Sequence, residues 1–189
     1  MLDIQKQYNI VKNSLKEKRF IHTLGVVSTA KKLAKLNDVS IEKAEIAALS
    51  HDIAKNMPLE DMKKLIDKNN IILSEDEKVT TELWHSILAP IVAKEKLGIE
   101  DEEILSSIRW HTTGKENMSK LDKIIYIADM IEPSRNFPGL DEIRKSTLES
   151  LDKGVLLGIN HSIEYLLNKG ALIDINTIKA RNYMIKEEL

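Results

Sequence analysis

Cysteine is absent from this chain of 189 residues, which excludes disulfides and thiolate metal sites and fits a reducing compartment. Long hydrophobic runs are also missing, since no segment approaches the roughly 18 continuous apolar residues that a membrane span needs. The N-terminal stretch lacks the apolar core of a signal peptide. We therefore expect a cytoplasmic protein that does not enter a membrane.

An excess of charge of one sign is missing too. Lysine and arginine number 28 against 30 aspartates and glutamates, which gives a formal net charge of −2. This balance predicts no broad attraction to nucleic acid or to an anionic membrane. It leaves room for a local basic site that binds a phosphorylated small molecule.

Glycine, proline and aromatic residues are scarce, and apolar residues recur at helical spacing along most of the chain. Ser74 with Glu77 and Ser119 with Asp122 have the pattern of a capping box, which marks the start of a helix. We predict helices over residues 3–16, 19–36, 40–55, 58 onward, 84–97, 101–111, 120–132, 140–168 (one long helix or two short ones) and 178–188. The sequence predicts a single all-α domain, a helical bundle over residues 1–189.

Several polar side chains lie on helical faces that should be buried. His22 shares a face with Val26, and His51 lies on an alanine-rich stripe with Asp52 beside it. Asp129 stands within the apolar run IIYIADMI. A carboxylate buried there without a partner would cost several kcal/mol or be forced to protonate. These positions therefore need a common explanation.

Each of these residues alone has an ordinary structural interpretation, as a core histidine or a capping aspartate. Together they are explained by one bound cation, because imidazole and carboxylate are ligands for iron, manganese, zinc and similar divalent metals. His85 and His111 have similar apolar neighbours. His161 does not, and we expect it to be structural.

The order His22, His51-Asp52, Asp129 resembles the H…HD…D pattern of the HD superfamily of metal-dependent phosphohydrolases. The stretches RFIHTLGV, SHDIAK, WHTTG and ADMIEPSRNFPG resemble more closely one branch, the YqeK-type hydrolases that cleave diadenosine tetraphosphate symmetrically. The resemblance covers nearly the whole chain and implies an HD-type helical fold. The segment 173–182 departs from the family pattern because it lacks a usual His-Pro pair.

The resemblance implies that His22, His51, Asp52 and Asp129 hold a divalent metal. Iron is the ion we favour, with manganese, cobalt and zinc as alternatives. His85 and His111 are expected to face the same cavity, where they would bind phosphate oxygens or, alternatively, complete a second metal site. The expected substrate-binding residues are Arg19, Lys55, His85, His111, Thr112, Arg135 and Thr177.

The implied reaction is hydrolysis of a phosphoanhydride by metal-activated water, which converts diadenosine tetraphosphate into two ADP. Asp52, His85 and His111 are the expected catalytic residues, and Asp52 and His85 are equal candidates to orient the attacking water. The alternatives are an HD phosphohydrolase for another nucleotide, such as a nucleoside monophosphate or guanosine tetraphosphate, and a nucleotide-binding HD domain without catalysis. The helical surface could also support a homodimer.

Overall fold

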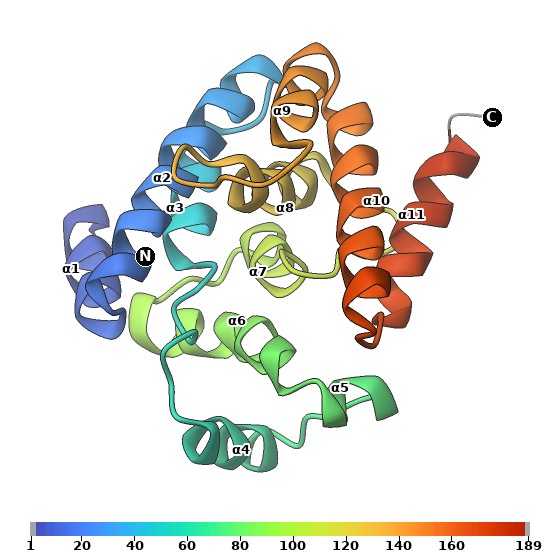
Figure 1. The fold of residues 1–189 in the computed structure, drawn as a ribbon. Coiled ribbons are helices and arrows are strands. Elements are labelled where there is room, and N and C mark those ends of the chain that lie inside the picture. Colours follow the sequence, from blue (N-terminus) through green and yellow to red (C-terminus); the bar gives the residue numbers. More distant parts are fainter. Residues whose placement is uncertain (1–2, 188–189) are drawn as a thin grey trace.

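The computed structural model describes residues 3–187, and over that range it contains helices and no strand (Figure 1). The all-α prediction is confirmed. The helices are α1 (Ile4–Ser14), α2 (Glu17–Leu36), α3 (Ile41–Ser50), α4 (Leu59–Lys68), α5 (Glu75–Val79), the 3-10 turn η1 (Thr81–Leu83), α6 (Trp84–Leu97), α7 (Glu102–Arg109), α8 (Lys120–Ile131), α9 (Leu140–Glu149), α10 (Leu151–Lys169) and α11 (Ile175–Glu187).

Helices α2, α3, α7 and α8 form the centre of the bundle and pack against one another. Figure 1 shows α8 lying between α2 and α3 on one side and α10 on the other, with α9 above it. The core between them is aliphatic, with fully buried side chains such as Leu49, Ile108 and Ile125. None of the described helices combines the length and apolar character that crossing a membrane requires.

Local signals set the helix ends as predicted. Capping boxes begin α5 at Ser74 and Glu77 and α8 at Ser119 and Asp122, and their side chains satisfy backbone N–H groups that have no partner within the helix. Gly98 ends α6 in the left-handed conformation, with φ of 62°.

Two predicted helices end earlier than expected. Helix α3 stops at Ser50 rather than near residue 55, and the segment that follows is a series of turns in which Lys55 N–H bonds the carbonyl of Asp52. A helix that continued to residue 55 would have placed Lys55 one turn after His51 on the same face, and the turns remove this alignment. Helix α7 likewise ends at Arg109. Tight turns thus carry the histidines of both segments, His51 and His111.

The segment 140–168 forms two helices because Ser150 is extended, with φ of −155°, and its hydroxyl accepts a hydrogen bond from the Lys153 N–H at the start of α10. The final helix begins three residues earlier than predicted, where Asp174 accepts a hydrogen bond from the Asn176 N–H. Its predicted last residue, Glu188, lies outside the described residues.

Candidate metal centre

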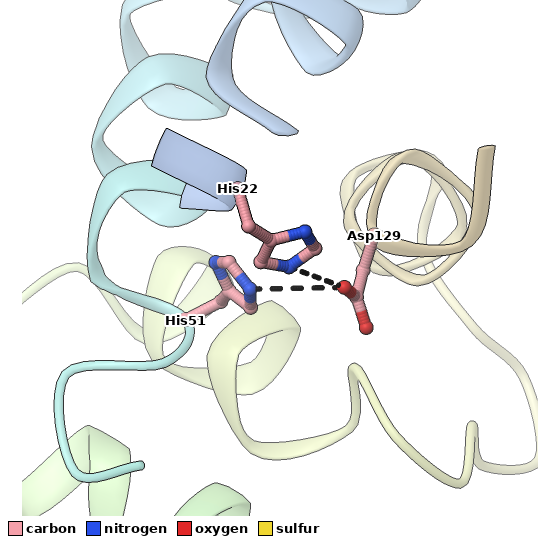
Figure 2. A group of neighbouring side chains, drawn as sticks. All are labelled: His22, His51 and Asp129. Atoms are coloured by element: carbon pink, nitrogen blue, oxygen red, sulfur yellow. Dashed lines mark ion pairs between the residues drawn. The ribbon is translucent and has the colours of Figure 1, made fainter. Parts of the chain in front are cut away.

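Three segments that are distant in the sequence bring His22, His51 and Asp129 together (Figure 2). His22 comes from α2, His51 from the turn after α3, and Asp129 from the last turn of α8. One ligand atom of each residue lies within 4.8 Å of the others. The Nε2 atom of His22 is 2.9 Å and that of His51 4.0 Å from Oδ1 of Asp129.

A second group shares His51 with the first and adds Asp52 and His111, again with ligand atoms within 4.8 Å. Asp52 is its centre, because Nε2 of His51, His85 and His111 lie 3.4, 3.3 and 3.7 Å from its carboxylate. The Nε2 atoms of His85 and His111 are 3.3 Å apart. The metal-ligand candidates therefore form one continuous cluster with the two other histidines.

The other ring nitrogen of each histidine fixes where its proton lies. Nδ1 of His51, His85 and His111 bonds the backbone carbonyls of Ala48, Glu82 and Ile108 at 2.6, 2.6 and 2.7 Å. A carbonyl oxygen only accepts, so each Nδ1 must donate. In a neutral ring, Nε2 then presents a lone pair to the carboxylates, which is the arrangement typical of metal-binding histidines.

These lone pairs face negative charge, which requires a cation nearby. Among residues 3–187, His22 Nε2 and His51 Nε2 are buried and make no hydrogen bond, although both lie within 4.0 Å of the Asp129 carboxylate. Burial alone would lower the pKa of His51, but Asp52 and Asp129 raise it, so this imidazole tends to bind a proton or another cation. A divalent ion would satisfy the unpartnered nitrogens and the carboxylates together, and the residues present fit such an ion.

The ionisation states also suit metal binding. Burial and the neighbouring His111 lower the pKa of His85 to about 3, and burial and His51 lower the pKa of His111 to about 4. Burial alone would raise the pKa of Asp129, but the nearby His22, His51 and Arg135 hold it well below its usual range. At neutral pH, two imidazoles are therefore uncharged and the carboxylate is ionised.

Three basic side chains surround the cluster. Arg19 lies 3.0 Å from Asp52, and Arg135 donates to Asp129 at 2.7 Å. Lys55 Nζ lies 3.3 Å from both ring nitrogens of His85. Burial lowers the pKa of Lys55, although Asp52 opposes this effect. The cluster thus combines buried ligands with a cationic rim, as a site for a phosphorylated substrate requires.

The family model described as HD domain matches residues 19–134, a range that holds every residue of this cluster. The chain belongs to the HD-domain family. The resemblance found in the sequence is therefore confirmed, together with the implied HD-type fold. An HD domain with such a His and Asp cluster binds a divalent metal.

Relatives of this HD-domain chain match it end to end. It is 38% identical to a symmetrical bis(5'-nucleosyl)-tetraphosphatase of Bacillus subtilis (strain 168), over 93% of this chain and 94% of that protein. It is also 38% identical to a protein of the same name from Halalkalibacterium halodurans, over 97% of each. A crystal structure of a predicted HD superfamily hydrolase involved in NAD metabolism from Clostridium acetobutylicum covers 99% of both chains, with a TM-score of 0.95 and 42% identity.

The sequence did not predict the role of Glu132, which bonds His22 on the side of the ring that faces away from the cluster. Its Oε1 lies 3.0 Å from His22 Nδ1, and its carboxylate also accepts hydrogen bonds from the N–H (2.7 Å) and the hydroxyl of Ser134. Glu132 is 1% exposed. One indication of this residue was present in the sequence, since Glu132 directly follows the apolar helix that carries Asp129.

Gly25 makes room for this carboxylate, because a Cβ at position 25 would overlap Oε2 of Glu132. We predict that Gly25→Ala lowers the free energy of unfolding by about 1–3 kcal/mol, although alanine is normally the better helix former. The carboxylate cannot move aside without losing His22 and Ser134. Urea denaturation would measure the change, and Gly25→Ala combined with Glu132→Ala should be less destabilised than the two single changes predict. A Gly25→Ala protein as stable as the wild type would contradict this packing.

Cavities border the HD cluster on two sides. One, of about 510 Å³, lies between α8 and α10 and reaches Asp129, Arg135 and His111. The other, of about 420 Å³, lies beside α2 and reaches His22, Arg19 and Arg135. A substrate could therefore extend from the metal ligands in two directions.

The two predicted threonines have different positions. Thr112 lines the larger cavity, and its hydroxyl lies 3.0 Å from that of Ser86. Thr177, 4% exposed on α11, lines neither cavity bordering the cluster among the described residues. That Thr177 binds substrate therefore stays a prediction.

Proposed function

We propose that this HD-domain protein is a symmetrical bis(5'-nucleosyl)-tetraphosphatase, which hydrolyses diadenosine tetraphosphate to two ADP. One observation carries the proposal: a set of imidazole and carboxylate ligand candidates, buried except for the partly buried Asp129 and rimmed by basic side chains, in a chain that matches proteins of this name along almost its whole length. A nucleotide-binding domain without catalysis would not need all of these ligands.

The metal that we propose is one iron ion held by His22, His51, Asp52 and Asp129. Such an ion supplies a nucleophile near neutral pH by acidifying water, and it withdraws charge from a phosphoryl oxygen. His111 completes a second group with His51 and Asp52, so a second ion is the alternative to phosphate binding by His111. Elemental analysis of the protein purified without chelator would identify the metal, and one equivalent per chain would support the single-ion proposal.

The basic side chains around the cluster are proposed to bind the polyphosphate. Arg19, Lys55 and Arg135 would bind phosphate oxygens and neutralise charge as the bond to the leaving group breaks. His85 is the residue that we propose to orient the attacking water. Its Nδ1 donates to the Glu82 carbonyl, so in the neutral ring Nε2 keeps a lone pair inside the cluster, 3.3 Å from Asp52, His111 and Lys55. Both oxygens of Asp52 already have neighbours, Arg19 and His51 on one side and His85 and His111 on the other.

A substrate panel tests the activity. The metal-loaded protein is incubated with diadenosine tetraphosphate, guanosine tetraphosphate and a nucleoside monophosphate, and the products are separated by chromatography. We expect ADP as the sole product from diadenosine tetraphosphate and little turnover of the others. ATP with AMP as products, or faster release of phosphate from a monophosphate, would reject the proposed function.

Lys55 offers a separate prediction about substrate binding. Lys55→Ala should raise the Michaelis constant or lower turnover by about tenfold or more, the effect of losing one charged contact to phosphate. Metal content should be unchanged, because the Lys55 ammonium contacts His85 and makes no hydrogen bond or ion pair with the side chains of the four proposed ligands. Lys68→Ala on α4, whose side chain is 70% exposed, is the control. If bound metal fell along with activity, the assigned role of Lys55 would be wrong.

The same proposal includes a cytoplasmic location and a homodimer, both of which stay predictions. The cysteine-free composition supports the first. Light scattering coupled to gel filtration would test the second, with a mass of twice 21.5 kDa as the expected result.

A further inference from the structure

The larger cavity has two chemically different ends. At one end lie Asp129, Arg135 and His111, all belonging to the metal cluster or its rim. Most of the remaining wall is aromatic or aliphatic, with residues such as Phe137 and Tyr165. A volume of about 510 Å³ is within the range of cavities that hold small organic ligands. The cavity thus pairs a charged end with an apolar one.

The apolar end is organised as an aromatic shelf, which we define as Phe137, His161 and Tyr165. The rings of Phe137 and His161 are stacked, with centroids 4.6 Å apart and an interplanar angle of 25°. Tyr165 follows His161 by one turn of α10, so both side chains lie on the same face of the helix. Tyr165 is 57% exposed, a large amount for an aromatic side chain that also lines a cavity.

The packing of α10 against α8 creates this arrangement. A Cβ at Gly158 would come within 2.9 Å of the Ile127 side chain and 3.0 Å of the Met130 side chain, so glycine lets α10 approach α8 without displacing them. One turn further along α10, the Ser162 hydroxyl comes to lie 3.4 Å from that of Tyr126 on α8. The aromatic shelf is therefore held at a fixed position relative to Asp129, which is on the same face of α8 as Tyr126 by helical spacing.

We propose that this cavity binds the nucleoside of one ADP half of the substrate, with the base stacked on the aromatic shelf and the phosphates directed past Thr112 and Arg135 to the metal ligands. The inference rests on the proposed function and adds to it the direction in which the substrate lies. Stacking on an aromatic side chain is the usual way to hold a base. His161, for which the sequence predicted a structural role, is in this proposal a specificity-determining residue.

The second cavity supports this direction by contrast. It is lined by the basic side chains Lys16, Lys18 and Arg19, and no Phe, Tyr or Trp appears in its lining over residues 3–187. Such a surface suits phosphates and offers no platform for a base. The two cavities meet at Arg135, which lines both. The polyphosphate would therefore run from the aromatic shelf across the cluster toward this basic cavity.

Calorimetric titration of the metal-loaded protein tests the proposal with two probes, ADP and inorganic pyrophosphate. Tyr165→Ala and His161→Ala should each weaken ADP binding by about tenfold, the effect of losing one stacking partner. Pyrophosphate, which has no base, should bind both variants as it binds the wild type. Tyr165→Phe and His161→Phe keep an aromatic ring and should retain ADP binding. Leu167→Ala, at a position on α10 that is 64% exposed and outside the cavity lining, is the matched control.

ADP affinity equal to the wild type in both alanine variants would overturn the proposal, and so would an equal loss of ADP and pyrophosphate binding. The measurement requires no turnover. If diadenosine tetraphosphate were not hydrolysed but the alanine variants still lost ADP selectively, the proposed function would fail and the nucleoside site would stand.

Discussion

Replacing His51 by alanine should abolish both tight metal binding and hydrolysis of diadenosine tetraphosphate. His51 is the one residue shared by the two groups of neighbouring metal-ligand candidates in the described part of the chain. Its Nε2 lies between the carboxylates of Asp52 and Asp129. Loss of a metal that provides several kcal/mol of transition-state stabilisation corresponds to a fall in turnover of about a thousandfold or more.

The variant should remain folded, which separates loss of the site from loss of the protein. His51 lies in the turns after α3, and the packing of α3 against α2 and α7 is made by aliphatic side chains such as Ile46 and Leu49. Elemental analysis and the ADP assay give the two primary measurements, and circular dichroism confirms helical content. Turnover that survives in a folded His51→Ala protein would reject the metal hypothesis.

The sequence predicted which polar side chains lie together better than it predicted the ends of the helices that carry them. His22, His51, Asp52 and Asp129 were identified because burial of polar groups on apolar faces needs a common explanation, and the structure does bring them together. The predicted end of α3, however, lay five residues beyond its actual end at Ser50. Helical periodicity persists through Ile53 and Ala54, which are buried, although the backbone there has turned.

The residues that the sequence missed act through tertiary contacts that no local pattern indicates. His161 has ordinary helical neighbours, and only the approach of α10 to α8 and the stack on Phe137 place it at the cavity. Thr177 stays a prediction, because a match to a family pattern does not by itself orient a side chain. Contacts between helices determine where both side chains lie, and spacing along one helix carries no information about such contacts.

Glu132 gives the second prediction with a large expected effect. A carboxylate that accepts from a metal-binding histidine fixes the tautomer and orientation of the ring and raises its basicity. In this protein Glu132 bonds His22 at Nδ1, on the side of the ring away from Asp129. Glu132→Ala or Glu132→Gln should therefore weaken metal affinity by about 10–100-fold, measured by competition with a chelator at fixed pH.

Two controls separate this positioning role from a general effect of charge or folding. Glu116→Gln removes the same charge at an exposed position and should leave metal affinity unchanged. Nitrogen-15 NMR of the histidine rings should show the Nδ1–H tautomer for His22 in the wild type and a mixture of tautomers in Glu132→Ala, because no acceptor then holds the proton at Nδ1. Wild-type affinity together with an unchanged tautomer would show that Glu132 only fills space beside Gly25. A loss of affinity with a changed tautomer would mean that metal binding at α2 depends on a residue that never contacts the ion.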